Sequence, residues 1–154
     1  MVFLINCRNH LSQEHLNGFL SDLNITDCKL GSKLADLKAN EKIKNDLSFI
    51  FVSDSLNLYQ LKNQNINLYN LDTVDIVLLN FRKDSLQSIL VEVSCDLNDG
   101  KFEKTYNLLK SKYGEPKSNP LKSGLFKIYT WIDGKERLML KPVVTSFIMK
   151  YYIK

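Results

Sequence analysis

The feature that most constrains the fold of this chain is the short spacing between its apolar runs. Residues 48–53, 56–61, 73–81 and 86–95 are rich in Ile, Leu, Val, Phe and Tyr, and most of the connections between them are of hairpin length. Antiparallel strands can be joined by a tight turn, whereas parallel strands need a crossover of about a dozen residues or more. The spacing therefore predicts an antiparallel sheet and argues against a doubly wound parallel one.

Three further strands are predicted at the end of the chain, at Leu125–Ile132, Lys135–Lys141 and Val143–Ile153. The last of them has one largely apolar face, which consists of Val143, Thr145, Phe147, Met149, Tyr151 and Ile153. The residues between these positions are more polar, and such alternation is typical of an antiparallel strand with one exposed face.

Helical spacing of apolar residues precedes the first strands and separates the two groups of strands. It predicts one helix around Leu16–Asn24 after an N-cap at Ser12, and a second helix that starts at Ser32. A third, mid-chain helix is predicted from Asn98 to Tyr113, where Gly114 ends it. The chain is thus predicted to be a single α+β domain over residues 1–154, an antiparallel sheet with two N-terminal helices and one mid-chain helix packed on it.

Composition sets broad limits on location. The chain has 154 residues and 44% hydrophobic residues, but no apolar run approaches the roughly 20 residues that span a bilayer. The apolar start Val2–Asn6 is interpreted as a strand, although removal of a signal peptide stays open. Three widely spaced cysteines, Cys7, Cys28 and Cys95, are typical of a reducing compartment. These features predict a cytoplasmic protein.

Recognisable chemistry is sparse in this sequence. It has no glycine-rich phosphate loop and no nucleophile elbow. Only Cys7 and His10 have the close spacing of zinc ligands, and Cys28 or Cys95 would have to meet a histidine in space to form a nucleophile pair. We therefore expect no catalytic residue, no metal and no cofactor, with an unrecognised cysteine or carboxylate site as the enzymatic alternative.

The charge is unevenly distributed. Residues 1–100 hold 9 Lys and Arg against 13 Asp and Glu, whereas residues 101–154 hold 12 against 4. A basic C-terminal third suits an acidic partner, and it makes a nucleic-acid-binding module the second hypothesis, with Lys127, Arg137 and Lys141 as contact residues. Solvation is the simpler interpretation, because most of these cations are lysines.

The segment Tyr129–Arg137 predicts a hairpin around Asp133-Gly134, and its register decides which side chains are exposed. A two-residue turn puts Tyr129 and Trp131 on one face with Leu138, in the core. A three-residue turn instead exposes a patch of aromatic and basic residues, which consists of Lys127, Tyr129, Trp131, Arg137 and Met139. Such a patch has the composition of a protein-binding site, so these five residues are the predicted partner-binding set.

The segment from Leu108 through Tyr113-Gly114 to Pro116, followed by Tyr129-Thr-Trp131 and a basic hairpin, resembles small bacterial α+β proteins. These include immunity proteins of contact-dependent inhibition systems and related envelope proteins. The resemblance covers residues 86–141 at most, and it implies a compact scaffold whose partner is another protein. It carries over no functional residue. A non-catalytic binding protein, most concretely a toxin-immunity protein, is therefore the leading hypothesis.

Overall fold

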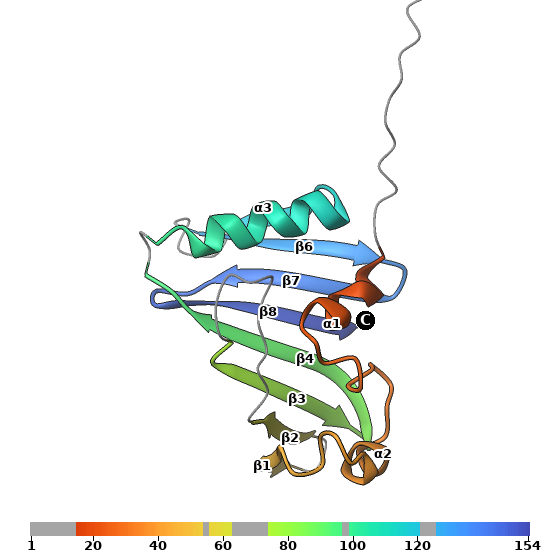
Figure 1. The fold of residues 1–154 in the computed structure, drawn as a ribbon. Coiled ribbons are helices and arrows are strands. Elements are labelled where there is room, and N and C mark those ends of the chain that lie inside the picture. Colours follow the sequence, from red (N-terminus) through yellow and green to blue (C-terminus); the bar gives the residue numbers. More distant parts are fainter. Residues whose placement is uncertain (1–14, 54–55, 63–73, 97–98, 121–125) are drawn as a thin grey trace, which may run out of the picture.

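The computed structural model describes residues 15–53, 56–62, 74–96, 99–120 and 126–154. The predicted strand at Val2–Asn6 and the predicted cap at Ser12 lie outside these residues. The elements follow one another as η1 (Leu16–Gly18), α1 (Phe19–Asp22), α2 (Leu34–Ala39), β1 (Leu47–Ser53), β2 (Leu56–Leu61), β3 (Ile76–Arg82), β4 (Ser85–Ser94), α3 (Lys101–Tyr113), β5 (Lys117–Pro120), β6 (Lys127–Asp133), β7 (Glu136–Pro142) and β8 (Ser146–Ile153) (Figure 1).

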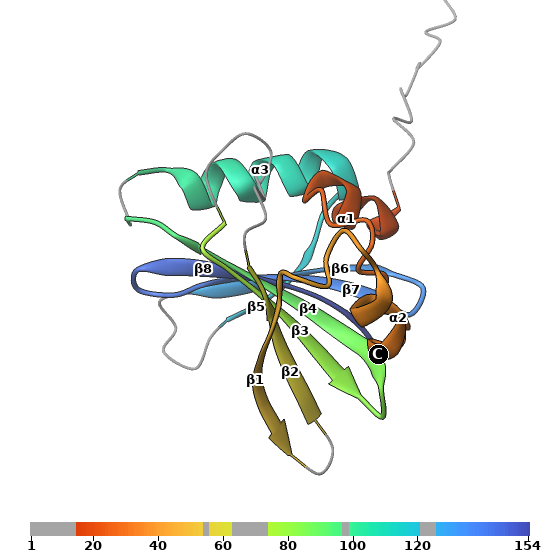
Figure 2. The same cartoon turned by 60° about the horizontal axis from the view of Figure 1, so that its bottom comes forward.

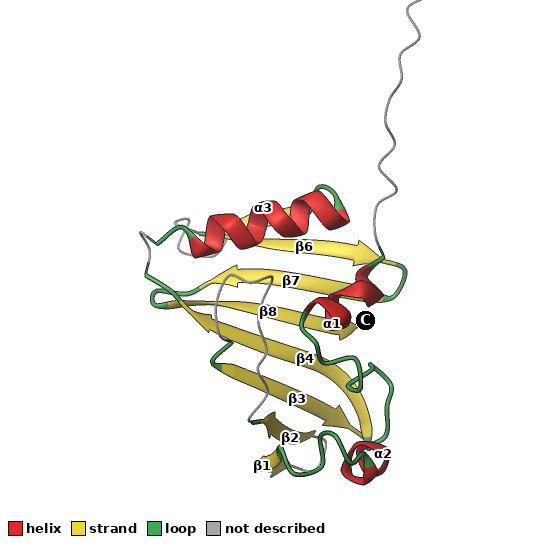
Figure 3. Ribbon diagram, viewed as in Figure 1, coloured by secondary structure: helices red, strands yellow, loops and turns green. Residues whose placement is uncertain are grey.

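The described strands form one antiparallel sheet in the order β1-β2-β3-β4-β8-β7-β6-β5 (Figure 3). Strands β1 to β4 follow one another as a meander, and strands β5 to β8 form a second meander. The two meanders meet where β8 pairs with β4, for example at Val91 and Met149. The antiparallel α+β fold that the short connections predict is confirmed.

The helices lie on one side of this sheet, and Figure 2 shows α1 and α3 together above it. The aromatic contacts identify this side as the core: the ring of Phe19 from α1 lies 5.8 Å from that of Tyr151, and the ring of Tyr106 from α3 lies 6.3 Å from that of Trp131. We call this side of the sheet the helix side.

The α3 helix agrees closely with its prediction. Leu109 and Tyr113 are buried against the sheet, and Gly114 ends the helix with a φ of 79°, which favours glycine. At the other end the Asp99 carboxylate accepts a hydrogen bond from the backbone N–H of Lys101 at 2.8 Å. The first N-terminal helix is shorter than predicted, because η1 and α1 together span only Leu16–Asp22.

The hairpin between β6 and β7 has a two-residue turn, but its turn residues are Gly134 and Lys135. The predicted turn at Asp133-Gly134 is wrong by one residue, and the opposing pairs shift by two, so that Trp131 lies opposite Leu138. A shift of two preserves the faces, because side chains alternate with a period of two. Gly134 has a φ of 54° at the first turn position, where a common hairpin turn carries glycine.

Differences from the predicted strands include those at β5 and β8. The strand β5 was not predicted, since Lys117–Pro120 contains no apolar run. The last strand begins at Ser146 rather than Val143, because the backbone N–H of Val143 donates to the Ser146 carbonyl and closes a turn.

Candidate binding surface

The structure separates the five predicted partner-binding residues. Tyr129 and Trp131 lie on the helix side under α3, and Trp131 is only 2% exposed. The indole Nε1 of Trp131 donates to the Gly114 carbonyl at 2.8 Å. Arg137 and Met139 lie on the opposite side of the sheet, and Lys127 is exposed at the start of β6. The hairpin has a two-residue turn, the first of the two alternatives, whose register buries the aromatics, so the five residues do not form one exposed patch.

The side of the sheet that carries Arg137 and Met139 is covered by no helix among the described residues, and we call it the open face. Its side chains lie in three rows that the pairing register defines. The first row is Lys141, Ile148, Glu92 and Ile76. The second is Lys117, Thr130, Met139, Lys150, Leu90, Leu78, Gln60 and Ser48. The third is Ile132, Arg137, Tyr152, Ser88, Asn80, Leu58 and Phe51.

These rows combine apolar and basic side chains. The apolar residues extend from Ile132 on β6 to Phe51 on β1, which are 43% and 52% exposed. The cations of the rows are Lys117, Arg137, Lys141 and Lys150. Glu92 is the carboxylate of the three rows, and it accepts a hydrogen bond from Ser146 at 2.8 Å. The open face is therefore apolar in part and positively charged over β5 to β8.

The open face continues into an apolar sheet edge at β1. Phe49, Ile50, Phe51 and Val52 are between 46% and 57% exposed, and the strand carries no charged residue. A bulge between Phe49 and Phe51 places Phe49 against Tyr59 on the helix side and Phe51 opposite Leu58 on the open face. An edge strand exposes unpaired backbone groups, and proteins usually protect it with charges or proline. The other edge, β5, has both Lys117 and Pro120, so β1 stands out.

Sequence analysis missed most of this surface. The sequence predicts Leu58, Leu78, Leu90 and Ile148 only as parts of strands, in which they occupy alternate positions. The alternation shows that these residues share a side with their strand neighbours. It does not show which side the helices cover, and that information comes from the tertiary structure.

The pKa values of both described cysteines are raised. Burial, together with the nearby Asp27, raises the pKa of the Cys28 thiol to about 12. Burial and the charge of Asp99 also raise the pKa of Cys95. A reactive cysteine usually has a lowered pKa, since the thiolate is the nucleophile. The imidazole of His15 is hydrogen-bonded to the Asp133 carboxylate at 2.9 Å.

No group of three or more His, Cys, Asp or Glu residues that could hold a metal is found within the described ranges. Cys7 and His10 lie outside these ranges. Two aspartates at strand ends form local hydrogen bonds: Asp75 accepts from the backbone N–H of Ser94, and Asp99 accepts from that of Asp96. None of the helices in the part of the chain that the structure describes is long and apolar enough to cross a membrane.

The comparisons with known proteins give one result. The model of the TP0088 domain family matches residues 25–153, which include every strand of the sheet together with α2 and α3. No curated protein and no solved structure matches the chain. Because the match extends over most of the sequence, the chain belongs to the TP0088 domain family.

Proposed function

We propose that this chain is a non-catalytic protein-binding domain whose partner docks on the open face. The observation that carries the proposal is the set of apolar side chains from β1 to β8 that no described helix covers. Monomeric proteins rarely leave large contiguous apolar surfaces exposed, and such surfaces mark interaction sites. The half-exposed Phe51 joins this surface to the β1 edge, where main-chain groups are available to a partner.

The charge of the open face describes the partner further. Lys117 projects from β5, Arg137 and Lys141 from β7, and Lys150 from β8, and Glu92 is the one carboxylate of the described rows. A partner with an acidic surface is therefore attracted to β5–β8, and the attraction accelerates association at low salt. In its most concrete form, suggested by the resemblance to immunity proteins, the partner is a bacterial toxin and binding neutralises it in the cytoplasm.

The proposal is tested by purifying tagged protein from its native host and comparing the recovered partners of four chains. These are the wild type, Met139→Asp in the middle of the open face, Phe51→Asp at its β1 end, and Val144→Asp. Val144 is 69% exposed in the turn between β7 and β8, so it controls for the loss of an exposed apolar side chain.

We expect a specific partner with the wild type and with Val144→Asp, and its loss with both open-face variants. A titration of the purified partner should then show at least about tenfold weaker binding for Met139→Asp, since hot-spot losses exceed about 1.4 kcal/mol. Equal recovery with all folded variants contradicts the proposal. The toxin-immunity version of the proposal makes a further demand. The partner must be toxic when it is produced alone and harmless when the two proteins are produced together.

A nucleic-acid-binding module is the second candidate, and the cations of the open face together with Tyr152 favour it. The ammonium of Lys150 lies 5.4 Å from the centre of the Tyr152 ring, and Arg137 pairs with Tyr152 in the third row. Bases stack on aromatic rings, and cations track the phosphates. This candidate requires a mobility shift at low salt that weakens steeply as salt rises and disappears with Arg137→Gln and Lys141→Gln. An unchanged mobility at low salt excludes it.

A further inference from the structure

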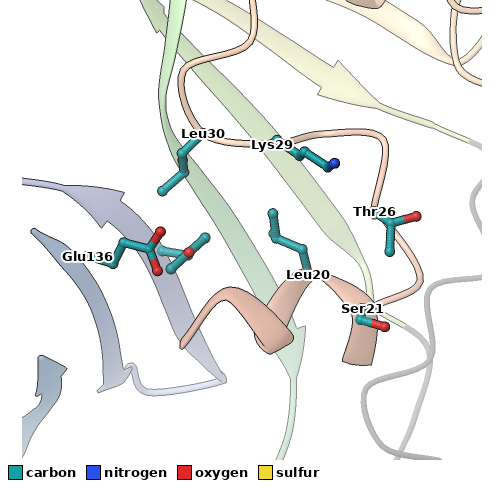
Figure 4. Close-up of a pocket in the computed structure, with 7 residues that line it drawn as sticks. Leu20, Ser21, Thr26, Lys29, Leu30 and Glu136 are labelled. Atoms are coloured by element: carbon teal, nitrogen blue, oxygen red, sulfur yellow. The ribbon is translucent and has the colours of Figure 1, made fainter. Parts of the chain in front are cut away.

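A separate cavity lies on the helix side, away from the open face. It has a volume of about 410 Å³ and lies between α1, the segment 26–30 and the ends of β7 and β8 (Figure 4). Its lining residues are Leu20, Ser21, Thr26, Lys29, Leu30, Glu136 and Tyr151. Small-molecule sites commonly have volumes of about 300–1,000 Å³ and a few convergent polar groups in an apolar wall. The cavity has the size and the mixed lining of such a site.

The floor of the cavity is fixed by packing. Leu20 is 6% exposed and Tyr151 is 2% exposed, and the Tyr151 ring packs against Phe19. The α1 helix is held in place because Asp22 accepts hydrogen bonds from the Lys112 ammonium at 2.6 Å and from the Tyr113 hydroxyl at 2.9 Å. A ligand therefore enters a preformed site, which reduces the cost of ordering it.

Two opposite charges line this cavity from different elements. Figure 4 shows Glu136 on one side and Lys29, Thr26 and Ser21 on the other, with Leu20 between them. Neither Lys29 nor Glu136 forms an ion pair with another residue in the described ranges. The Glu136 carboxylate accepts a hydrogen bond from the Tyr151 hydroxyl. Its remaining acceptor positions, like the Lys29 ammonium, can pair with a ligand.

We propose that this cavity binds a short peptide, two or three residues long, through its two free termini. The peptide ammonium lies at the Glu136 carboxylate, and the peptide carboxylate lies at the Lys29 ammonium. Apolar side chains of the peptide contact Leu20 and Leu30. Capture of free chain termini by charged and polar groups is a recurring mode of peptide recognition. This site is independent of the protein-binding function proposed for the open face.

The experiment is isothermal titration of the full chain with leucyl-leucine, its N-acetylated form and its C-amidated form. For the wild type, each cap should weaken binding by at least about fivefold, which corresponds to the loss of one partly exposed ion pair. In Glu136→Gln, acetylation should no longer matter while amidation still does. In Lys29→Met, amidation should no longer matter while acetylation still does. Lys104→Met, an exposed position on α3, is the matched control and should behave as the wild type.

Each variant should lose the effect of one cap and keep the effect of the other. This pattern distinguishes recognition of the peptide termini from a general loss of structure, because a damaged fold weakens the binding of all three peptides alike. Thermal melting of each variant without peptide checks its folding independently. The proposal is overturned when the wild type binds none of the peptides, when capped and free peptides bind it equally, or when the caps keep their wild-type effect in both cavity variants.

Discussion

At the scale of single residues, Asp133 connects segments that are far apart in the sequence. Its carboxylate accepts a hydrogen bond from the His15 ring at 2.9 Å and from the backbone N–H of Leu16 at 3.2 Å. These contacts hold the start of η1 against the turn between β6 and β7. Asp133 is the last residue of β6, and the two turn positions that follow are Gly134 and Lys135.

The pairing of Asp133 predicts a dependence of stability on pH. The hydrogen bond with His15, and then that with Leu16, lowers the pKa of the Asp133 carboxyl below its ordinary value. Such a group stabilises the fold above its unfolded pKa of about 4, and the stabilisation is lost as the pH falls through the lowered folded pKa. The difference in urea midpoint between wild type and Asp133→Asn should therefore shrink as the pH falls from about 5 through the lowered folded pKa. A constant difference over this range contradicts the prediction, and Asp36→Asn on the exposed side of α2 is the control.

Trp131, the only tryptophan of the chain, allows the hairpin register to be tested in solution. It is 2% exposed, so its fluorescence should be blue-shifted and poorly quenched by acrylamide. The adjacent Ile132 points to the open face and is 43% exposed. Moving the tryptophan by one position, with Trp131→Phe and Ile132→Trp together, should give red-shifted and readily quenched emission. Red-shifted emission from the wild type would show that the register is wrong.

At the scale of elements, α3 illustrates how one helix stabilises half of the sheet. Leu109 of this helix is fully buried. The ring centres of Phe102 and Tyr106 lie 6.3 Å and 4.6 Å from the ring centre of Tyr129. The aromatic contacts follow from the helical spacing of these residues, which places them on one stripe. The stripe therefore attaches α3 to β6.

Removal of one buried side chain from α3 should destabilise the fold. Leu109→Ala should lower the free energy of unfolding by about 2–5 kcal/mol, because it removes apolar contacts and leaves a cavity. Asn107→Ala, on the exposed side of the same helix, should change it by less than about 0.5 kcal/mol. Urea unfolding followed by circular dichroism measures both values. Similar losses for the two variants would mean that α3 does not bury Leu109 in solution.

The elements differ in how far the sequence predicts them. Strand β2 was predicted at its exact bounds, and α3 nearly so, because local periodicity and turn residues determine both. Strand β5 has no periodic pattern, and only its pairing with β6 makes it a strand. The adjacency of β4 and β8 is a long-range pairing that no local pattern contains. For the same reason the strands of the open face could be predicted but not their exposure as one surface.

At the scale of the whole molecule, the two meanders share one core on the helix side, and η1 and α1 belong to it. Leu16, Phe19, Leu20 and Leu23 are at most 6% exposed, and Phe19 reaches Tyr151 near the middle of the sheet. The family match begins only at residue 25, after these residues. The start of the family match and the physical boundary of the core therefore differ in this chain.

That difference predicts the effect of a truncation. A chain of residues 24–154 keeps the whole family match but loses the buried side chains of Leu16, Phe19, Leu20 and Leu23. Burial of each such side chain contributes about 1.5–3 kcal/mol, so the loss is roughly 6–12 kcal/mol, comparable with the total stability of about 5–15 kcal/mol. Residues 24–154 should therefore show no cooperative urea transition, whereas residues 15–154 should show one. Ser21→Ala in the longer chain is the control, because this side chain is exposed. Equal urea midpoints for the two chains would place η1 and α1 outside the core.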